Sequence, residues 1–364
     1  MPVDFIGLIA TQDGSESTPA TTALIDPAFT TRIARAHEDS GFDQVLLGYS
    51  SAYPEGAQVA AYAAARTETL KFLVAHRPGF VAPTLAARTF ATLDQFTGGR
   101  VTLNIITGGH DVEQRRDGDY LAKDDRYART DEYLGILRQA WLSDVPFSHR
   151  GPIYRFEDFV SQVKPVNGTI PIYFSGSSPA AYRTGVKHAD VYMFWGEPLA
   201  QIKEQIASVR AEAAAIGRAA PRFSVSFRPI LGPTEELAWE RAEAILGRIG
   251  QVTAPRFFRN SDRASPANTG SQRLLAAAAE GDRHDRALWT ATAKASGAAG
   301  NSTALVGTPE TVAQALLDYY DLGVTTFLIR GYDPLDDAID YGRELIPAVR
   351  AEINRRDTAR LVAA

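Results

Sequence analysis

The sequence predicts a (β/α)8 barrel of the TIM type, a single domain over residues 1–364 with an insertion after the seventh strand. A length of 364 residues suits one such barrel. Eight short apolar segments have the character of buried strands, and nearly all are followed by a helical pattern. The amino-acid composition does not change along the chain in a way that would indicate a second domain. An open doubly wound sheet is the alternative, but no glycine-rich dinucleotide motif follows the first strand.

The predicted strands are short runs of apolar residues. They are Asp4–Ala10, Gln44–Leu47, Leu70–Ala75, Val101–Ile106, Ile172–Phe174, Asp190–Phe194, Phe223–Leu231 and Val324–Ile329. Each of the helices has periodic apolar positions, and several have a start or stop signal such as Asp26-Pro27 or Gly98-Gly99. They are predicted at Pro27–Ser40, Ala57–Arg66, Pro83–Phe96, Arg126–Trp141, Pro179–His188, Ala200–Gly217, Glu235–Ile249, Pro309–Leu322 and from the eighth strand to about Arg355.

Three segments depart from this rhythm. Asp111–Asp125 is a polar loop, and alternating aromatic and polar residues predict an added hairpin at about 145–165. Gly250–Ser302 is rich in Gly, Ser and Asn, with two helix-like pieces at Gln272–Glu280 and Asp285–Ala295. Since it follows the seventh strand at the end where barrel enzymes hold their chemistry, we expect a mobile lid.

Composition excludes several classes of protein. The net charge of −5, the pI of about 5.8 and the lack of a basic run argue against nucleic acid and anionic membranes as partners. Without cysteine the chain has no disulfide and no thiolate chemistry. None of the six histidines has metal-ligand spacing, so we expect no metal site. The N-terminus has no basic n-region and no apolar run reaches the length of a membrane span, which predicts a cytoplasmic protein.

Polar residues gather where the predicted strands end. Residues 175–178, Ser-Gly-Ser-Ser, join a strand to a helix and suit either a phosphate at a helix N-terminus or an ordinary N-cap. Arg77, Arg228 and Arg330 are near three other strand ends. They indicate either rim salt bridges or a site for an anionic substrate. Trp195 and Tyr332 could form a flat wall for an aromatic ring or cap the core.

Seven segments resemble the bacterial luciferase-like family of flavin-dependent monooxygenases, and within it the alkanesulfonate monooxygenases. They are LKFLVAHRPG (70–79), PTLAARTFATLDQFTGGRVTLNIITGG (83–109), RRDGDYLAKDDRYARTDEYLGILRQAW (115–141), PIYFSGSS (171–178), ADVYMFWGEP (189–198), TALVGTP (303–309) and GYDPLDDA (331–338). The resemblance implies a TIM barrel that takes reduced FMN from a separate NAD(P)H-dependent flavin reductase. With O2 such enzymes cleave a C–S bond to give an aldehyde and sulfite, and a homodimer or homotetramer is expected.

The resemblance also implies roles for individual residues. Thr107 ends the strand that flanks the flavin ring, and Tyr127, Ser177 and Ser178 match the phosphate side. His76, which follows the third strand, is also assigned to cofactor binding. Trp195 and Tyr332 match the active-site tryptophan and tyrosine, and Arg228 is assigned to catalysis with them. Gln12, Ser226 and Arg330 are assigned to the substrate.

The substrate half departs from the alkanesulfonate pattern. Ser226-Phe227-Arg228 stands in place of Arg-x-His, and Gln12 stands where a histidine is usual. The loop GYSSAYPEG (48–56) lacks the family's cysteine, and SGAAGNSTALVG (296–307) has no clear counterpart of its lid arginine. With these departures, the sequence resembles the sulfoquinovose monooxygenases, which desulfonate a sugar, more than the alkanesulfonate enzymes. A deazaflavin (F420) oxidoreductase of the same barrel family, or a protein that only stores flavin, remains an alternative.

Overall fold

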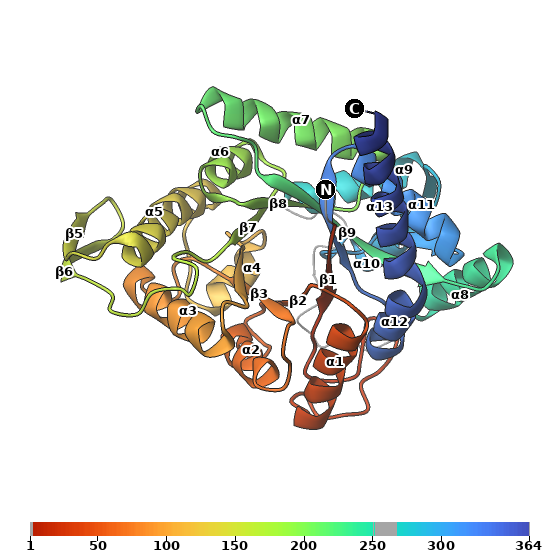
Figure 1. Ribbon diagram of the computed structural model, residues 1–364, viewed down its shortest axis with the longest axis horizontal. Coiled ribbons are helices and arrows are strands. Elements are labelled where there is room, and N and C mark those ends of the chain that lie inside the picture. The colour runs from red at the N-terminus through yellow and green to blue at the C-terminus, as the bar shows by residue number, and fades with distance from the viewer. Residues whose placement is uncertain (1–2, 250, 252–267, 364) are drawn as a thin grey trace. The chain divides into compact units, whose positions relative to one another are not determined.

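The computed structural model describes residues 3–249, 251 and 268–363 (Figure 1). Eight strands alternate with helices along the chain. They are β1 (Asp4–Leu8), β2 (Gln44–Leu47), β3 (Lys71–His76), β4 (Val101–Ile105), β7 (Ile172–Ser175), β8 (Val191–Trp195), β9 (Arg222–Leu231) and β13 (Val324–Ile329). The strand order β9-β13-β1-β2-β3-β4-β7-β8, with a further pairing of β8 and β9, confirms the predicted (β/α)8 fold class.

The helices between the strands begin at or next to the predicted residues, except α5, which begins at Lys123 rather than at Arg126. They are α1 (Pro27–Asp39), α2 (Gly56–Ala64), α3 (Pro83–Thr97), α5 (Lys123–Leu142), α6 (Pro179–His188), α7 (Leu199–Ala215), α8 (Glu235–Arg248), α11 (Pro309–Asp321), α12 (Pro334–Asp340) and α13 (Ile346–Ala363). The side chain of Asp26 accepts a hydrogen bond from the Phe29 amide at 2.9 Å and caps α1. Gly98 ends α3 with a φ of +68°, a left-handed conformation that glycine adopts without strain.

Outside the predicted insertion, two helical segments differ from the prediction. The predicted polar loop 111–125 contains a short helix, α4 (Asp111–Arg116), with acidic residues in its first turn and arginines in its last. This charge order favours a helix because it complements the helix dipole. The predicted closing helix is interrupted by a π-helical turn, η1 (Tyr341–Leu345), between α12 and α13. Where the added hairpin is predicted, β5 (Phe147–Arg150) pairs antiparallel with β6 (Arg155–Phe159).

Part of the predicted lid, residues 250 and 252–267, lies outside the described residues. The rest forms α9 (Thr269–Glu280), β10 (Arg283–His284), β11 (Leu288–Trp289) and α10 (Ala291–Ser296), followed by β12 (Ala304–Gly307). The predicted helical piece over Asp285–Ala295 is therefore wrong at Leu288 and Trp289, whereas its end from Ala291 lies in α10. Buried Leu288 and Trp289 instead pair with β12, which itself extends the sheet beside β9. Non-local pairing decides the conformation of this short apolar segment.

The chain divides into two compact units. Unit 1 comprises Met1–Val45, Met193–Ala207 and Arg222–Ala364, and unit 2 comprises Leu46–Tyr192 and Ser208–Pro221. Each unit has buried aromatic residues of its own, such as Phe5 against Phe327 in unit 1 and Phe174 against Tyr192 in unit 2. In the part of the chain that the structure describes, none of the helices combines the length and apolar character needed to cross a membrane.

Candidate functional site

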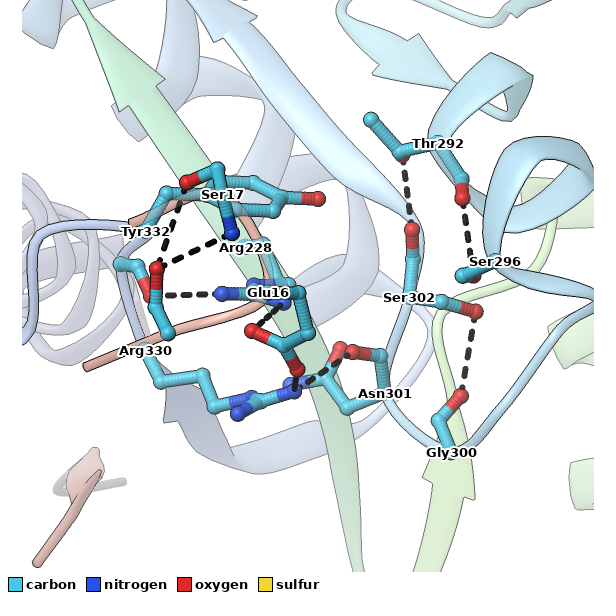
Figure 2. A network of polar contacts seen from close by, with 12 residues as sticks. Glu16, Ser17, Arg228, Thr292, Ser296, Gly300, Asn301, Ser302, Arg330 and Tyr332 are labelled. Carbon is cyan, nitrogen blue, oxygen red and sulfur yellow. Dashed lines mark hydrogen bonds and ion pairs between the residues drawn. The ribbon is translucent and has the colours of Figure 1, made fainter. Parts of the chain in front are cut away.

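A cluster of charged side chains lies in unit 1, where β1, β9 and β13 are followed by loops (Figure 2). Glu16, in the loop after β1, bridges two arginines. Its Oε2 lies 3.0 Å from Nη1 of Arg228, and its Oε1 accepts a hydrogen bond from Nη2 of Arg330 at 2.7 Å. The Arg228 side chain is 3% exposed, Arg330 22% and Glu16 36%, so the carboxylate covers the more deeply buried guanidinium.

The parallel pairing of β9 with β13 brings the two arginines together. Phe227 pairs with Ile329, and the amide of Arg330 donates to the carbonyl of Phe227 at 3.3 Å. Side chains two positions apart on a strand share a face, so Ser226 and Arg228 lie on the same side of β9. Ser226 is buried and lies within 3.4 Å of the Phe194 carbonyl, to which its hydroxyl donates.

Tyr332 and the backbone before it hold Arg228 from the other side. The Arg228 guanidinium lies over the Tyr332 ring, 3.5 Å from its centroid, and Nη2 donates to the Gly331 carbonyl at 2.8 Å. Asp337, at the start of α12, accepts hydrogen bonds from the amides of Tyr332 and Asp333 at 2.8 and 2.9 Å. A side chain at position 331 would collide with the Asp337 carboxylate, which explains the glycine.

The charges of this cluster are strongly coupled. Burial alone would raise the pKa of Glu16, but the two arginines hold it well below the ordinary range of a carboxyl group. Burial opposes the charge of Arg228, yet the Glu16 carboxylate raises its pKa. The pKa of Arg330 is lowered by burial and by the neighbouring Arg228. Two arginines and one carboxylate leave one net positive charge, so the cluster can attract a monoanion.

Two other residues predicted from the sequence belong to unit 1. Trp195 ends β8, and its half-buried indole packs against Gly270 of α9 and a small cluster of Leu274, Ala293 and Ala298. The described part of the predicted insertion therefore contacts this tryptophan directly. Gln12 is half-buried in the loop after β1, four positions before Glu16.

In unit 2, the loop between β7 and α6 meets α5. Ser178 is the N-cap of α6 and accepts from the Ala181 amide at 3.3 Å, and it is also hydrogen-bonded to Tyr127. Gly176 has a φ of +146°, and a Cβ there would lie 2.6 Å from the Ala181 side chain and 3.1 Å from the Tyr127 hydroxyl. The glycine thus lets Ala181 and the Tyr127 hydroxyl approach the loop backbone closely, and hydroxyl groups gather at the N-terminus of α6. These residues fit a flavin phosphate.

The surroundings of Tyr127 support the same fit. Burial raises its pKa, so its hydroxyl remains protonated and can donate to an oxyanion. The Tyr192 hydroxyl donates to the Gly176 carbonyl at 2.7 Å, which holds the loop against β8. A cavity of about 330 Å³ opens beside Tyr127; the basic Arg183 and Lys187 and the acidic Asp124 and Glu212 line it, so the cavity itself has no excess of positive charge.

The other two predicted cofactor residues of unit 2 have different environments. Thr107 is buried just after β4, with its hydroxyl 3.3 Å from that of Thr130. His76 is also buried, with Nε2 2.7 Å from the Tyr133 hydroxyl and its ring edge-on to Phe90. Burial lowers the pKa of His76 to about 4. Because Tyr133 and Phe90 belong to helices α5 and α3, its side chain faces the helix layer, which favours a structural role.

Arg77, the third arginine of the sequence analysis, belongs to unit 2 and to a separate set of charges. Its guanidinium lies over the Tyr49 ring and 3.7 and 3.8 Å from Glu113 and Asp117, respectively. The Tyr49 hydroxyl donates to Asp117 at 2.8 Å. With two carboxylates around one guanidinium, this set offers no net positive charge to an anionic substrate.

Sequence reasoning missed Glu16 and Asp337. Both are acidic residues in polar loop or helix-start segments, where most carboxylates only face water, and no local pattern distinguishes them. Only the folded structure shows their partners, among them two arginines for Glu16 and two backbone amides for Asp337. Among the described ranges, no group of three or more His, Asp or Glu side chains could hold a metal ion.

The protein is an α/β barrel, with an arginine-rich polar cluster in unit 1 and a hydroxyl-rich loop after β7 in unit 2. Residues 3–326 match the family model described as luciferase-like monooxygenase. The chain therefore belongs to the luciferase-like monooxygenase family, whose flavin-dependent members include monooxygenases acting on small molecules.

Several solved structures share the fold. Riboflavin lyase, determined with modified FMN and riboflavin, has a TM-score of 0.80 and 20% identity, over 97% of this chain and 92% of its own. EDTA monooxygenase from Chelativorans sp. BNC1 has a TM-score of 0.79 and 17% identity, over 97% and 94%. An F420-dependent secondary alcohol dehydrogenase, in complex with an F420-acetone adduct, has a TM-score of 0.70 and 19% identity, over 96% and 99%. At these identities the similarity establishes the fold alone.

Proposed function

We propose that this protein is a monooxygenase that uses reduced FMN and O2 to desulfonate a small organosulfonate, with sulfoquinovose or an alkanesulfonate as the substrate. The observation that carries the proposal is the pair of arginines, Arg228 and Arg330, joined by one carboxylate at the ends of neighbouring strands. Arginine forms forked, charge-assisted hydrogen bonds to oxyanions, and one net positive charge matches one sulfonate.

The overall reaction balances without any further reactant. R–CH2–SO3⁻, O2 and FMNH2 give R–CHO, HSO3⁻, FMN and water. The bound flavin would supply the two electrons that reduce one oxygen atom to water, while the carbon–sulfur bond breaks and the other oxygen atom enters the aldehyde. A separate NAD(P)H-dependent reductase would regenerate the reduced flavin.

The residues of this chain would perform three tasks. Ser177, Ser178 and Tyr127 would hold the flavin phosphate at the N-terminus of α6, where backbone amides and the helix dipole favour an anion. Arg228 and Arg330 would orient the sulfonate. Trp195, packed under α9 and α10, would exclude water from the reacting carbon.

The test is release of sulfite from a panel of sulfonates, including sulfoquinovose, with FMNH2 generated by an added flavin reductase. We expect FMNH2-dependent and O2-dependent sulfite formation with at least one member of the panel. The Arg228→Met variant should raise the KM for the sulfonate far more than the KM for FMNH2. Absence of sulfite across the panel, from protein that binds FMNH2, would refute the proposed substrate class.

An F420-dependent oxidoreductase is the second candidate, and the similarity to the alcohol dehydrogenase favours keeping it. Anaerobic titration with FMNH2, FMN and F420 separates the two. A two-component monooxygenase should bind FMNH2 more tightly than FMN and be purified without colour. Tight binding of F420 with no response to FMNH2 would favour the second candidate.

A further inference from the structure

We propose that Glu16 is an internal substitute for the substrate oxyanion: it occupies the anion position between Arg228 and Arg330 in the free protein and yields it to the ligand. This inference rests on the proposed function for its choice of a sulfonate. Its own evidence is the geometry and charge of the bridge in Figure 2. It makes Glu16 a determinant of which anions bind and how tightly.

The carboxylate binds the arginines as a separate oxyanion would. Each carboxylate oxygen of Glu16 contacts a different guanidinium, at 3.0 Å to Arg228 and 2.7 Å to Arg330. Glu16 therefore binds neither arginine in a bidentate manner. A sulfonate has three oxygens, so it could replace both contacts and still have one acceptor left.

Unused hydrogen-bonding capacity surrounds the bridge. Nε of Arg228 and Oδ1 of Asn301 are both buried, and both lack a hydrogen-bond partner. The amide of the Asn301 side chain donates to the Phe227 carbonyl at 3.3 Å, and the Asn301 carbonyl lies 3.4 Å from Nη2 of Arg330. Buried polar atoms are normally paired, so Arg228 Nε and Asn301 Oδ1 could each form one more hydrogen bond, to a polar ligand. A hydroxyl group beside a sulfonate could donate to Asn301 Oδ1.

The backbone around Glu16 is held in place, and its side chain is partly exposed although the Oε2 atom is buried against Arg228. Ser17 is buried and bonded to Ser15, and Thr18 donates to Asp333 at 3.2 Å. Asp13 accepts hydrogen bonds from Thr21 and Thr22 farther along the loop. The Glu16 side chain itself is 36% exposed. Rotation about its side-chain torsions can therefore release the carboxylate to water without unfolding the loop.

Charge decides the consequence of that exchange. With Glu16 in place the cluster carries one net positive charge, and when the carboxylate turns outward two arginines face the ligand. An external anion must compete with a carboxylate that is tethered beside the same arginines, which weakens its apparent affinity. Removal of that competitor should strengthen anion binding.

The experiment measures binding of methanesulfonate to the flavin-free protein by calorimetry, at fixed ionic strength. Glu16→Gln should bind it at least about tenfold more tightly than the unchanged protein, a factor that corresponds to about 1.4 kcal/mol. Glu240→Gln, at an exposed residue of α8, removes the same charge and should leave the affinity unchanged. Adding Arg330→Met to Glu16→Gln should abolish the gain.

An equal or weaker affinity of Glu16→Gln would overturn the inference, because it would make the carboxylate part of the site or a purely structural bridge. Should Glu16→Gln fold poorly, Glu16→Asp gives the same test, since the shorter side chain cannot reach both arginines. The measurement needs neither flavin nor turnover. A failed sulfite assay would refute the proposed reaction while leaving this result to decide the role of Glu16.

Discussion

Replacement of Glu197 by Gln should remove a pH-dependent loss of stability. Glu197 follows β8, its side chain is 1% exposed, and Nε of Arg273 lies 3.1 and 2.9 Å from its two carboxylate oxygens. Burial raises the pKa of Glu197 from the ordinary value of 4.5 to about 7, because Arg273 offsets only part of the lost hydration. Glu197 links the segment after β8 to α9, so its ionisation bears on the part of the insertion that covers Trp195.

The sign and size of the effect follow from the raised pKa. Between pH 4.5 and about 7 the folded protein keeps a proton that the unfolded chain releases, so the free energy of unfolding falls as the pH rises through this window. A shift of about 2.5 pKa units corresponds to about 3 kcal/mol, at about 1.36 kcal/mol per unit. With an unfolding entropy of about 2.1 cal/mol/K per residue, this lowers the Tm by about 4 °C.

The assay compares the Tm of the unchanged protein, Glu197→Gln and Glu204→Gln by differential scanning fluorimetry from about pH 4.5 to about pH 8. Glu204 is the matched control, since it also contacts Arg273, at 3.3 Å, but is 65% exposed. The Tm difference between Glu197→Gln and the unchanged protein should rise by about 4 °C across the range in favour of the variant. A difference that stays constant with pH would show that Glu197 is ionised throughout and that the argument from burial is wrong.

Three further predictions concern the proposed cofactor residues of unit 2 and the arginine cluster of unit 1. Replacing both Ser177 and Ser178 with alanine should weaken FMNH2 binding by about 1–3 kcal/mol. Riboflavin binding should not change, because riboflavin lacks the phosphate. Equal losses in titrations of both flavins would contradict the assignment. Arg228→Lys keeps the charge but loses the planar fork, so kcat/KM for a sulfonate should still fall at least about tenfold, and a near-normal value would argue against a clamp. Asp337→Ala should lower the Tm and raise the KM for the sulfonate, because the Tyr332 amide loses its acceptor, whereas Asp336→Ala on the exposed side of α12 should do neither.

Much of the fold is determined by short stretches of sequence. Alternating apolar strands and helices, the cap at Asp26 and the glycine stop at Gly98 all act over a few residues, and the structure has them where the sequence predicts them. Ser178 likewise caps α6 as the local pattern indicates. Prediction fails where a short apolar segment is compatible with both helix and strand, as at Leu288 and Trp289. There, strand pairing with β12 outweighs helix propensity, and the partner strand is not visible in the local sequence.

The sequence by itself also determined which residues could carry chemistry, through the family motifs and the arginines at strand ends. Only the tertiary structure decided how those residues are partnered. Glu16 is 314 positions from Arg330, and parallel strand pairing brings them to 2.7 Å. The same packing turns His76 toward Tyr133 and the helices, while Arg77 joins two carboxylates in unit 2. A side chain's charge and shape are written in the sequence, but its burial and its partners depend on contacts between segments far apart in the chain, and these set its pKa and its availability to a ligand.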